Sequence, residues 1–390
     1  MVTDAGQGGA LSAERLQYLA DVVRQDIADG RYRGASIVVA RHGRIGLQEA
    51  IGQHSSTDSR PLRKDSVFSL LSVTKAFTNV LVLRAVELGR LALTTKVSAI
   101  IPEFSGKPRE NITLRHLMTH MSGLPPVFTP APGMNLDRLD EIVAAICRNV
   151  HSAEEPGRRV DYSPMAAHAL MGEMLRRSDP KKRSYRAIVE EDLLKPLGLK
   201  DTSVGVRSDL RERHVVPEFP PTFRVQHPGS RNLGVNGAFQ EEKAEMPWVG
   251  MISTALDLHR LAEMLRGRGT LDGVRILGPA VIERATQVHT GEHPNELYRS
   301  LALSRGWEPY PAYIGLGFSL RGERICHHQF GTLTSPRTYG NHGAGSTIFW
   351  VDPALDMTFV CLTSGVMDEG DNIERFQRLS DIAASAAEAA

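Results

Sequence analysis

Apolar residues recur along this chain at two spacings, and each spacing predicts a different kind of element. Recurrence at every third or fourth residue is typical of an amphipathic helix, whereas alternation is typical of a half-buried strand. Ser12, and later Ser253 or Thr254, are candidate N-caps, and Gly89 is a candidate helix stop. The helical pattern covers residues 11–30, 72–89, 113–120, 136–150, 164–177, 254–265 and 372–389.

Strand patterns occupy both ends of the chain and leave a helical block between them. They cover residues 36–40, 45–51, 314–320, 346–351 and 357–363, and the first two form a hairpin through residues 41–44. This order predicts an α+β fold, with an antiparallel sheet flanked by helices and a second, mainly helical lobe. We expect residues 1–60 and 251–390 to form the sheet lobe, residues 61–250 to form the helical lobe, and the site to lie between them.

Residues 207–247 are rich in proline and charge and show little periodicity. This segment fits a long loop around the rim of the site, and it fits a plain surface connection equally well.

Composition excludes several classes of protein. The 46 Lys and Arg residues almost balance the 45 Asp and Glu residues, so nothing predicts a nucleic-acid partner. No apolar run is long enough to cross a bilayer, and residues 1–10 lack the basic start and apolar core of a secretory signal. Cys147, Cys326 and Cys361 are few and widely spaced, as expected of free buried thiols in a reducing compartment. We therefore expect a cytoplasmic protein without a membrane partner, and the oligomeric state stays open.

Ser72 and Lys75 form a candidate catalytic pair. The two residues are three positions apart at the start of a predicted helix, so their side chains lie on one face of it. The hydroxyl and the amine can therefore meet. A serine hydroxyl needs a neighbouring base to become a nucleophile, and burial of Lys75 would favour its neutral, basic form. Ser178 and Lys181 have the same spacing, but the proline between them and the polar surroundings predict a turn without a catalytic role.

Two more segments complete a constellation. Asp161-Tyr162-Ser163-Pro164 precedes a predicted helix, and Tyr339-Gly340-Asn341-His342-Gly343-Ala344-Gly345-Ser346 leads into a predicted strand. Together with Ser72-Val73-Thr74-Lys75, this order resembles the serine penicillin-recognising family, which includes class C β-lactamases, DD-carboxypeptidases and family VIII carboxylesterases. Residues 112–124, 196–202 and 250–258 also resemble segments of that family, so the resemblance covers nearly the whole chain and implies a β-lactamase/DD-peptidase-like fold.

The resemblance implies roles for individual residues. Ser72 would be the acylated nucleophile, Lys75 its partner, and Tyr162 a second member of the proton relay. A lysine ammonium beside the phenol is expected to lower the pKa of Tyr162. The backbone N–H groups of Ser72 and of Ala344, on the strand of the third segment, would form the oxyanion hole.

Two departures from the family pattern concern the substrate. The β-lactamases place Lys-Thr-Gly where this chain has Asn341, His342 and Gly343, so an anionic substrate loses its point-charge partner unless Arg337 compensates. Pro164 stands where many relatives carry asparagine, and proline offers no side-chain amide. Both departures favour an ester of a neutral acid over a β-lactam.

Other residues complete the sequence-based picture of the site. Asn341, His342, Gly343 and Phe128 are the candidate substrate-binding residues, and several aromatic and apolar residues are further candidates for an acyl pocket: Trp307, Tyr310, Tyr313 and Met134. His116 and His120 have the helical spacing of metal ligands, but no nearby carboxylate or cysteine completes a set. We expect neither a metal nor a cofactor.

The function expected from these residues is that of a serine carboxylesterase acting on small or short-chain esters through a Ser72 acyl-enzyme. The same residues also fit an acyltransferase that passes the acyl group to an alcohol or amine. They fit an amidase, a D-amino-acid peptidase or a weak β-lactamase as well, and a non-catalytic binding relative is a further alternative. Whether Lys75 or Tyr162 takes the first proton stays open, because the pair can titrate as a unit.

Overall fold

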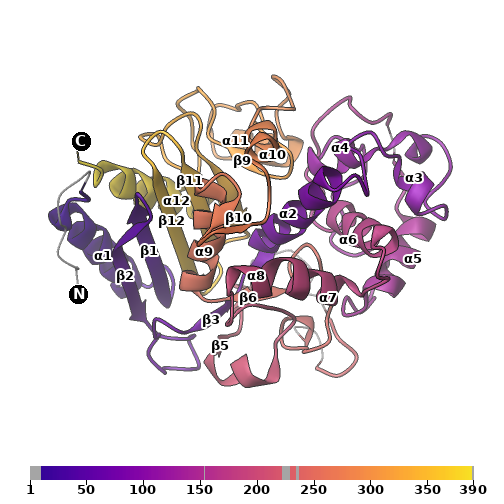
Figure 1. Cartoon of the computed structure of the whole chain (residues 1–390). Coiled ribbons are helices and arrows are strands. Elements are labelled where there is room, and N and C mark those ends of the chain that lie inside the picture. Colours follow the sequence, from indigo (N-terminus) through magenta and orange to yellow (C-terminus); the bar gives the residue numbers. More distant parts are fainter. Residues whose placement is uncertain (1–9, 153, 222–228, 234–236, 389–390) are drawn as a thin grey trace.

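The computed structural model describes residues 10–152, 154–221, 229–233 and 237–388. Its main element is a six-stranded antiparallel sheet with the strand order β2-β1-β12-β11-β10-β9 (Figure 1). The first hairpin of the chain therefore pairs with the last strand, so the strands at the two ends of the chain share one sheet, as predicted. The strands are β1 (Gly34–Arg41), β2 (Arg44–Gly52), β9 (Ser319–Leu320), β10 (Tyr339–Gly343), β11 (Thr347–Asp352) and β12 (Met357–Ser364).

Side chains alternate between the two faces of this sheet, and each face is buried in its own core. Ile37 and Val39 of β1 pack on one side under α1 (Ala13–Ala28) and α12 (Glu369–Ser385), while Val38 between them packs on the other. α9 (Ala255–Arg266) covers that second face (Figure 1). The sheet is thus the middle of three layers, which is why its central strands contain few polar residues.

Phe359 of β12 lies in the core under α1 and α12 with none of its surface exposed, and its ring stacks on Trp350 with centroids 5.4 Å apart. Phe359→Ala is expected to lower the free energy of unfolding by about 3–5 kcal/mol, since the sheet cannot close over the cavity left behind. Urea denaturation measures the loss. Tyr18→Ala on α1, where the side chain is 52% exposed, should change stability by less than about 0.5 kcal/mol. Equal losses in the two variants would contradict this account of the core.

The middle of the chain is mainly helical and continues the core on the α9 side of the sheet. Its longer helices are α2 (Thr74–Glu87), α5 (Leu139–Asn149) and α6 (Ala166–Ser178), with the shorter helices α3 (Val97–Ile100), α4 (Leu114–Met118), α7 (Tyr185–Val189) and α8 (Lys195–Leu197) around them. A small sheet of β4 (Ser203–Val204), β6 (Met251–Ser253), β3 (Val67–Ser69) and β5 (His214–Val215) links this part to the rest (Figure 1). Beyond α9 follow β7 (Thr270–Leu271), β8 (Val274–Arg275), α10 (Pro279–Ala285) and α11 (Glu296–Ser304).

Most predicted elements are confirmed, and the differences have physical causes. Ser12 caps α1 and Thr254 caps α9, and Gly89, with φ +69°, follows the end of α2. The strand predicted over 314–320 is wrong except for its last two residues. Gly315 packs against the Ala285 backbone, and Gly317 packs against the Asn79 side chain and donates its N–H to the Met118 carbonyl, so these residues do not pair in a ladder. The division into lobes at residues 60 and 251 stays a prediction, and the predicted end of the last helix at residue 389 lies outside the described residues.

All three cysteines carry free thiols, but Cys326 is only half buried, so the prediction of three buried thiols is wrong for this residue. In the described part of the chain, no helix combines the length and the apolar character needed to span a membrane. The cytoplasmic location stays a prediction, because it depends partly on residues 1–9, which lie outside the described residues.

Candidate active site

Ser72 lies where the chain passes from β3 into α2. Leu71 has φ +49°, and the residues Leu71–Val73 form a 3₁₀ turn before α2 begins at Thr74. The Leu70 carbonyl accepts a hydrogen bond of 2.8 Å from Thr347 Oγ1 on β11. This contact holds the turn against the main sheet, so Ser72 is positioned by the sheet and the helical region together.

Two side chains donate hydrogen bonds to the Ser72 hydroxyl. Lys75 Nζ and Tyr162 OH each lie 3.0 Å from Ser72 Oγ, and Lys75 Nζ also donates to the Trp248 carbonyl at 3.1 Å. Lys75 is 2% exposed, although it belongs to the first turn of α2. The three residues predicted to act together are therefore in direct contact, with Ser72 at the centre.

Burial sets the protonation states of the two partners. It lowers the pKa of Lys75 to about 7, because the ammonium loses its hydration and gains no carboxylate partner. Burial also raises the pKa of Tyr162, and the hydrogen bond with Ser72 offsets only part of this effect. The expected lowering of the Tyr162 pKa is thus wrong. Near neutral pH Lys75 has a substantial neutral population, and Tyr162 keeps its proton.

His120 packs against Tyr162. The two ring centroids are 4.8 Å apart, and His120 Nδ1 accepts a hydrogen bond from the Ser163 backbone at 3.1 Å. Burial, together with the charge of Lys75, lowers the pKa of His120 to about 3, so the ring stays neutral. His116 instead caps α4 by accepting from the Thr113 backbone. The described residues contain no group of three side chains placed to hold a metal ion.

The third segment forms β10 and borders the same site. Gly343 must be glycine, because an added Cβ would lie 2.7 Å from the Leu70 carbonyl oxygen. Asn341 Nδ2 donates to the Gly317 carbonyl at 3.1 Å. Ala344 lies in the turn after β10, so its placement on a strand is corrected, but it borders a cavity together with Ser72.

His342 of β10 is engaged by two polar groups. Its Nε2 lies 2.6 Å from Tyr298 OH and 3.2 Å from a Glu369 carboxylate oxygen. A proton on His342 would therefore be paired with Glu369, and the ring offers no free cation to a substrate. Arg337, the residue considered as a compensating cation, lines a separate cavity beside Tyr339 and Asp356.

Two chambers meet at the Ser72 hydroxyl and share Ser72, Tyr162, Tyr298 and His342. The first, named here the apolar chamber, has a volume of about 280 Å³. Its walls are mainly apolar and come from separate parts of the chain: Leu71, Phe128, Pro164, Phe219, Phe239, Trp248, Leu297 and Leu301. Phe219 and Phe239, which belong to the segment 207–247, are among these walls, while the role of the whole segment as a rim loop stays a prediction.

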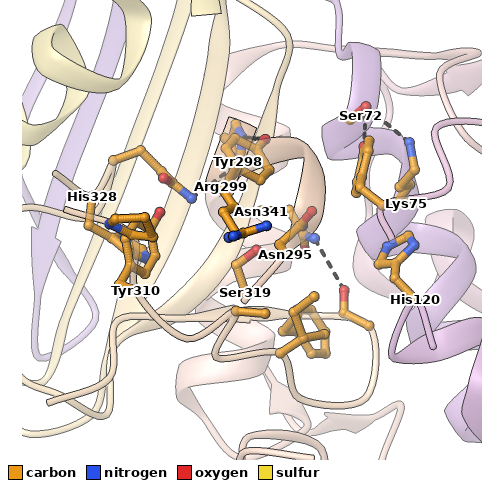
Figure 2. Close-up of a pocket in the computed structure, with 18 residues that line it drawn as sticks. Ser72, Lys75, His120, Asn295, Tyr298, Arg299, Tyr310, Ser319, His328 and Asn341 are labelled. Atoms are coloured by element: carbon orange, nitrogen blue, oxygen red, sulfur yellow. Dashed lines mark hydrogen bonds between the residues drawn. The ribbon is translucent and has the colours of Figure 1, made fainter. Parts of the chain in front are cut away.

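The second cavity, the polar chamber, has a volume of about 60 Å³. Its walls include Lys75, Asn295, Arg299, His328, Gln329 and Asn341. Figure 2 shows Ser72, Lys75 and His120 on one side of this chamber and Tyr298, Arg299 and Asn341 on the other. The site therefore joins an apolar and a hydrogen-bonding compartment at one hydroxyl group.

Sequence reasoning missed several residues of these walls. Tyr298, Leu297 and Leu301 come from α11, for which no prediction was made. Trp248 stands at the end of the rim loop and carried no local signal. Of the aromatic residues proposed for an acyl pocket, Phe128 lines the apolar chamber and Tyr310 lines the polar chamber, whereas Trp307 stacks on His327 instead.

Comparison with known proteins gives consistent matches over most of the chain. A family model described as Beta-lactamase matches residues 19–384. Esterase EstB of Burkholderia gladioli is 32% identical over 273 residues, which cover 63% of this chain and 68% of that protein. N-acetylmuramyl-L-alanine amidase of Bacillus subtilis (strain 168) is 25% identical over an alignment of 402 residues, covering 94% of this chain and 85% of that protein.

Solved structures match over almost the full length. A novel penicillin-binding protein homolog from Caulobacter crescentus has a TM-score of 0.77 and 24% identity, covering 97% of this chain and 99% of its own. EstCE1, described as a hydrolase with promiscuous acyltransferase activity, has a TM-score of 0.75 and 20% identity, with 95% and 99% covered. A family VIII carboxylesterase has a TM-score of 0.72 and 20% identity, with 95% and 98% covered. At these identities the three structures show a common fold.

Proposed function

This chain belongs to the beta-lactamase family of serine hydrolases, and from that premise we propose that it cleaves carboxylic esters through an acyl-enzyme on Ser72. The observation that carries the proposal is the Ser72 hydroxyl, 3.0 Å from both a buried amine and a protonated phenol. A neutral amine accepts a proton and a phenol donates one. The two partners thus supply the opposite proton transfers that ester cleavage needs.

Acylation begins with Lys75 as the base. Its neutral Nζ takes the proton of Ser72 Oγ while this oxygen attacks the ester carbonyl carbon. The N–H groups of Ser72 and Ala344 are the donors proposed to stabilise the negative charge on the carbonyl oxygen. The bond to the alcohol oxygen then breaks, and that oxygen receives the proton of the Tyr162 hydroxyl. The Lys75 ammonium then gives a proton back to Tyr162.

Deacylation repeats these transfers with water in the place of the alcohol. Water enters beside Lys75, loses a proton to the relay and attacks the acyl carbon. Ser72 Oγ leaves and recovers its proton, so the enzyme returns to its starting state. The proposed roles are those of the sequence prediction, with Lys75 as the first base because burial disfavours its charged form and the charged form of Tyr162 alike.

Three features support an ester over a β-lactam or peptide. Pro164 lines the apolar chamber and adds no amide group there. The charge of a protonated His342 would be paired with Glu369, which leaves no unpaired cation on β10 for an acidic substrate. The apolar chamber, at about 280 Å³, is near the lower end of ligand pockets, which typically span about 300–1,000 Å³, so it suits a small acyl group.

Amide cleavage is the second candidate, favoured by the long match to an amidase. An amine leaving group must be protonated as it departs, and Tyr162 holds a proton beside Ser72. The two candidates therefore differ in substrate recognition and share the nucleophile.

p-Nitrophenyl butyrate and its matched amide, butyryl p-nitroanilide, separate the candidates because they share one acyl group. The ester is expected to turn over many times, with a transient gain of one butyryl mass on the intact protein, and the anilide to turn over far more slowly. Release of the chromophore and intact-protein mass spectrometry measure the two effects. Faster turnover of the anilide, or of the β-lactam nitrocefin, would reverse the assignment. An adduct that never hydrolyses would indicate a binding protein. Transfer of most of the acyl group to an added alcohol, with little free acid formed, would indicate an acyltransferase.

A further inference from the structure

Two buried amide groups in the polar chamber keep a polar atom without a partner. Asn341 is 9% exposed and Gln329 is 4% exposed, and both line the chamber. Among the described residues, neither Asn341 Oδ1 nor Gln329 Oε1 has a hydrogen-bond partner. A buried acceptor without a donor costs stability, so its presence in an active site points to a donor supplied by the ligand.

The orientation of Asn341 is set by its surroundings. Its Nδ2 donates to the Gly317 carbonyl, and turning the amide over would bring two acceptor oxygens together. Figure 2 shows this side chain on the chamber wall that faces Ser72 and Lys75. The free oxygen of Asn341 is therefore a fixed acceptor. Gln329 has its Nε2 3.0 Å from His342 Nδ1, and either orientation of its amide leaves one polar end free.

Arg299 adds donors to these acceptors. The Arg299 side chain is 49% exposed and lines the same chamber, and its guanidinium lies 3.2 Å from a Glu296 carboxylate oxygen. A guanidinium has five N–H donors, so most of them stay available for an acceptor on a ligand. A ligand group that both donates and accepts, as a hydroxyl does, matches Asn341 Oδ1 and Arg299 together.

The polar chamber is the side from which the alcohol departs. Lys75 borders this chamber and not the apolar one. The water that releases the acyl group must approach the relay that contains Lys75, and it takes the position that the alcohol has left. The alcohol portion of the substrate therefore occupies the polar chamber, and the acyl group occupies the apolar chamber.

The size of the polar chamber limits the alcohol. At about 60 Å³ it holds a few water-sized groups, since one such group needs roughly 10–15 Å³ by this measure. A short chain of carbon atoms with one or two further hydroxyl groups fits this space, whereas a long alkyl chain matches neither its volume nor its polarity.

We propose that the substrate class of this site is the short-chain ester of a small polyhydroxylated alcohol of glycerol size, whose free hydroxyl groups donate to Asn341 and Gln329 and accept from Arg299. This inference rests on the proposed esterase function. Ser72 Oγ forms a bond to the acyl carbon and gives its proton to Lys75. The bond from that carbon to the alcohol oxygen breaks, the departing polyol takes the Tyr162 proton, and Lys75 returns a proton to Tyr162. Water then returns the carboxylic acid and the free serine.

The direct test compares 1-monobutyrin with propyl butyrate, because the two esters have the same acyl group and the same carbon skeleton. Each kcat/KM is divided by the rate of hydroxide-catalysed hydrolysis of that ester, which removes the difference in leaving-group reactivity. The wild-type ratio is expected to favour monobutyrin by about tenfold, the effect of one or two hydrogen bonds to neutral groups. A ratio of one or less, with both esters cleaved, would overturn the inference and leave the esterase function intact. No cleavage of either ester or of p-nitrophenyl butyrate would instead overturn the esterase function.

Asn341→Leu tests the acceptor itself. The variant is expected to lower the monobutyrin-to-propyl butyrate ratio about fivefold, whatever its absolute activity, because only the polyol uses the amide oxygen. Asn149→Leu, on α5 and outside both chambers, serves as the matched control and should keep the wild-type ratio. An unchanged ratio in Asn341→Leu would show that Asn341 does not recognise the polyol hydroxyl groups.

A second measurement needs no variant. The butyryl-enzyme formed from p-nitrophenyl butyrate is offered equal concentrations of glycerol and 1-propanol, and the two product esters are quantified. Glycerol is expected to capture more of the acyl group, because an incoming alcohol uses the same polar chamber. Preference for 1-propanol would overturn the proposal. Faster cleavage of 2-carboxyethyl butyrate than of monobutyrin would overturn it in favour of an anion bound at Arg299.

Discussion

Ser72→Ala is expected to reduce kcat for p-nitrophenyl butyrate by roughly 10⁴-fold or more, because removal of a catalytic nucleophile leaves only the binding and oxyanion contributions. The variant should show no butyryl adduct in intact-protein mass spectra. Its stability should fall by only about 1 kcal/mol, since Lys75 Nζ keeps its bond to the Trp248 carbonyl. The loss of activity is then chemical in origin and does not reflect unfolding.

Ser178→Ala is the matched control for this variant. Ser178 has a lysine three residues later, but its hydroxyl donates to the Leu175 carbonyl at the end of α6, at 3.3 Å. It borders a small cavity separate from the two chambers. Wild-type turnover and a full butyryl adduct are expected. Loss of activity in Ser178→Ala, together with an active Ser72→Ala, would show that the nucleophile has been misassigned.

Lys75→Met is expected to lower kcat by about 10²–10⁴-fold, the usual contribution of a general base. Methionine keeps the length of the side chain and suits a buried position better than an ammonium does, so the fold should persist. Steady-state kinetics and circular dichroism on the same sample separate the catalytic effect from a structural one. Activity close to that of the wild type would exclude Lys75 as the base.

The pH profile gives this variant its second readout. Only the neutral form of Lys75 accepts a proton, and its pKa lies at about 7. Wild-type kcat/KM should therefore rise with pH through about 7 and level off above it, since the neutral fraction grows as pH increases. The rise should be absent from the residual activity of Lys75→Met. A profile that rises through the same pH in both proteins would assign the titration to another group.

Local spacing determined part of this site before any tertiary contact was known. Ser72 and Lys75 are three residues apart at a helix start, so their meeting follows from helix geometry, and burial of the apolar helix around them indicated the direction of the Lys75 pKa shift. The family assignment, which the comparisons confirm, followed from three short segments in order. Such segments are informative because the required residues lie close together in the chain.

Tertiary structure decided what depends on distant residues. Tyr162 lies 90 positions from Ser72, and the burial that raises its pKa, offset only in part by the hydrogen bond with Ser72, depends on the packing around its hydroxyl. The walls of the apolar chamber come from α11, the rim loop and the turn after β10, and no local pattern connects them.

By itself, then, the sequence determined the family, the order of the main elements and the Ser72–Lys75 pair. Only the fold decided which end of the Asn341 amide is free, which chamber Arg299 lines and which groups lie within hydrogen-bond distance of His342. Helix spacing and strand alternation involve residues close together in the sequence, so they can be recognised from the sequence alone. The pKa values and the chamber walls depend on groups that meet only after folding.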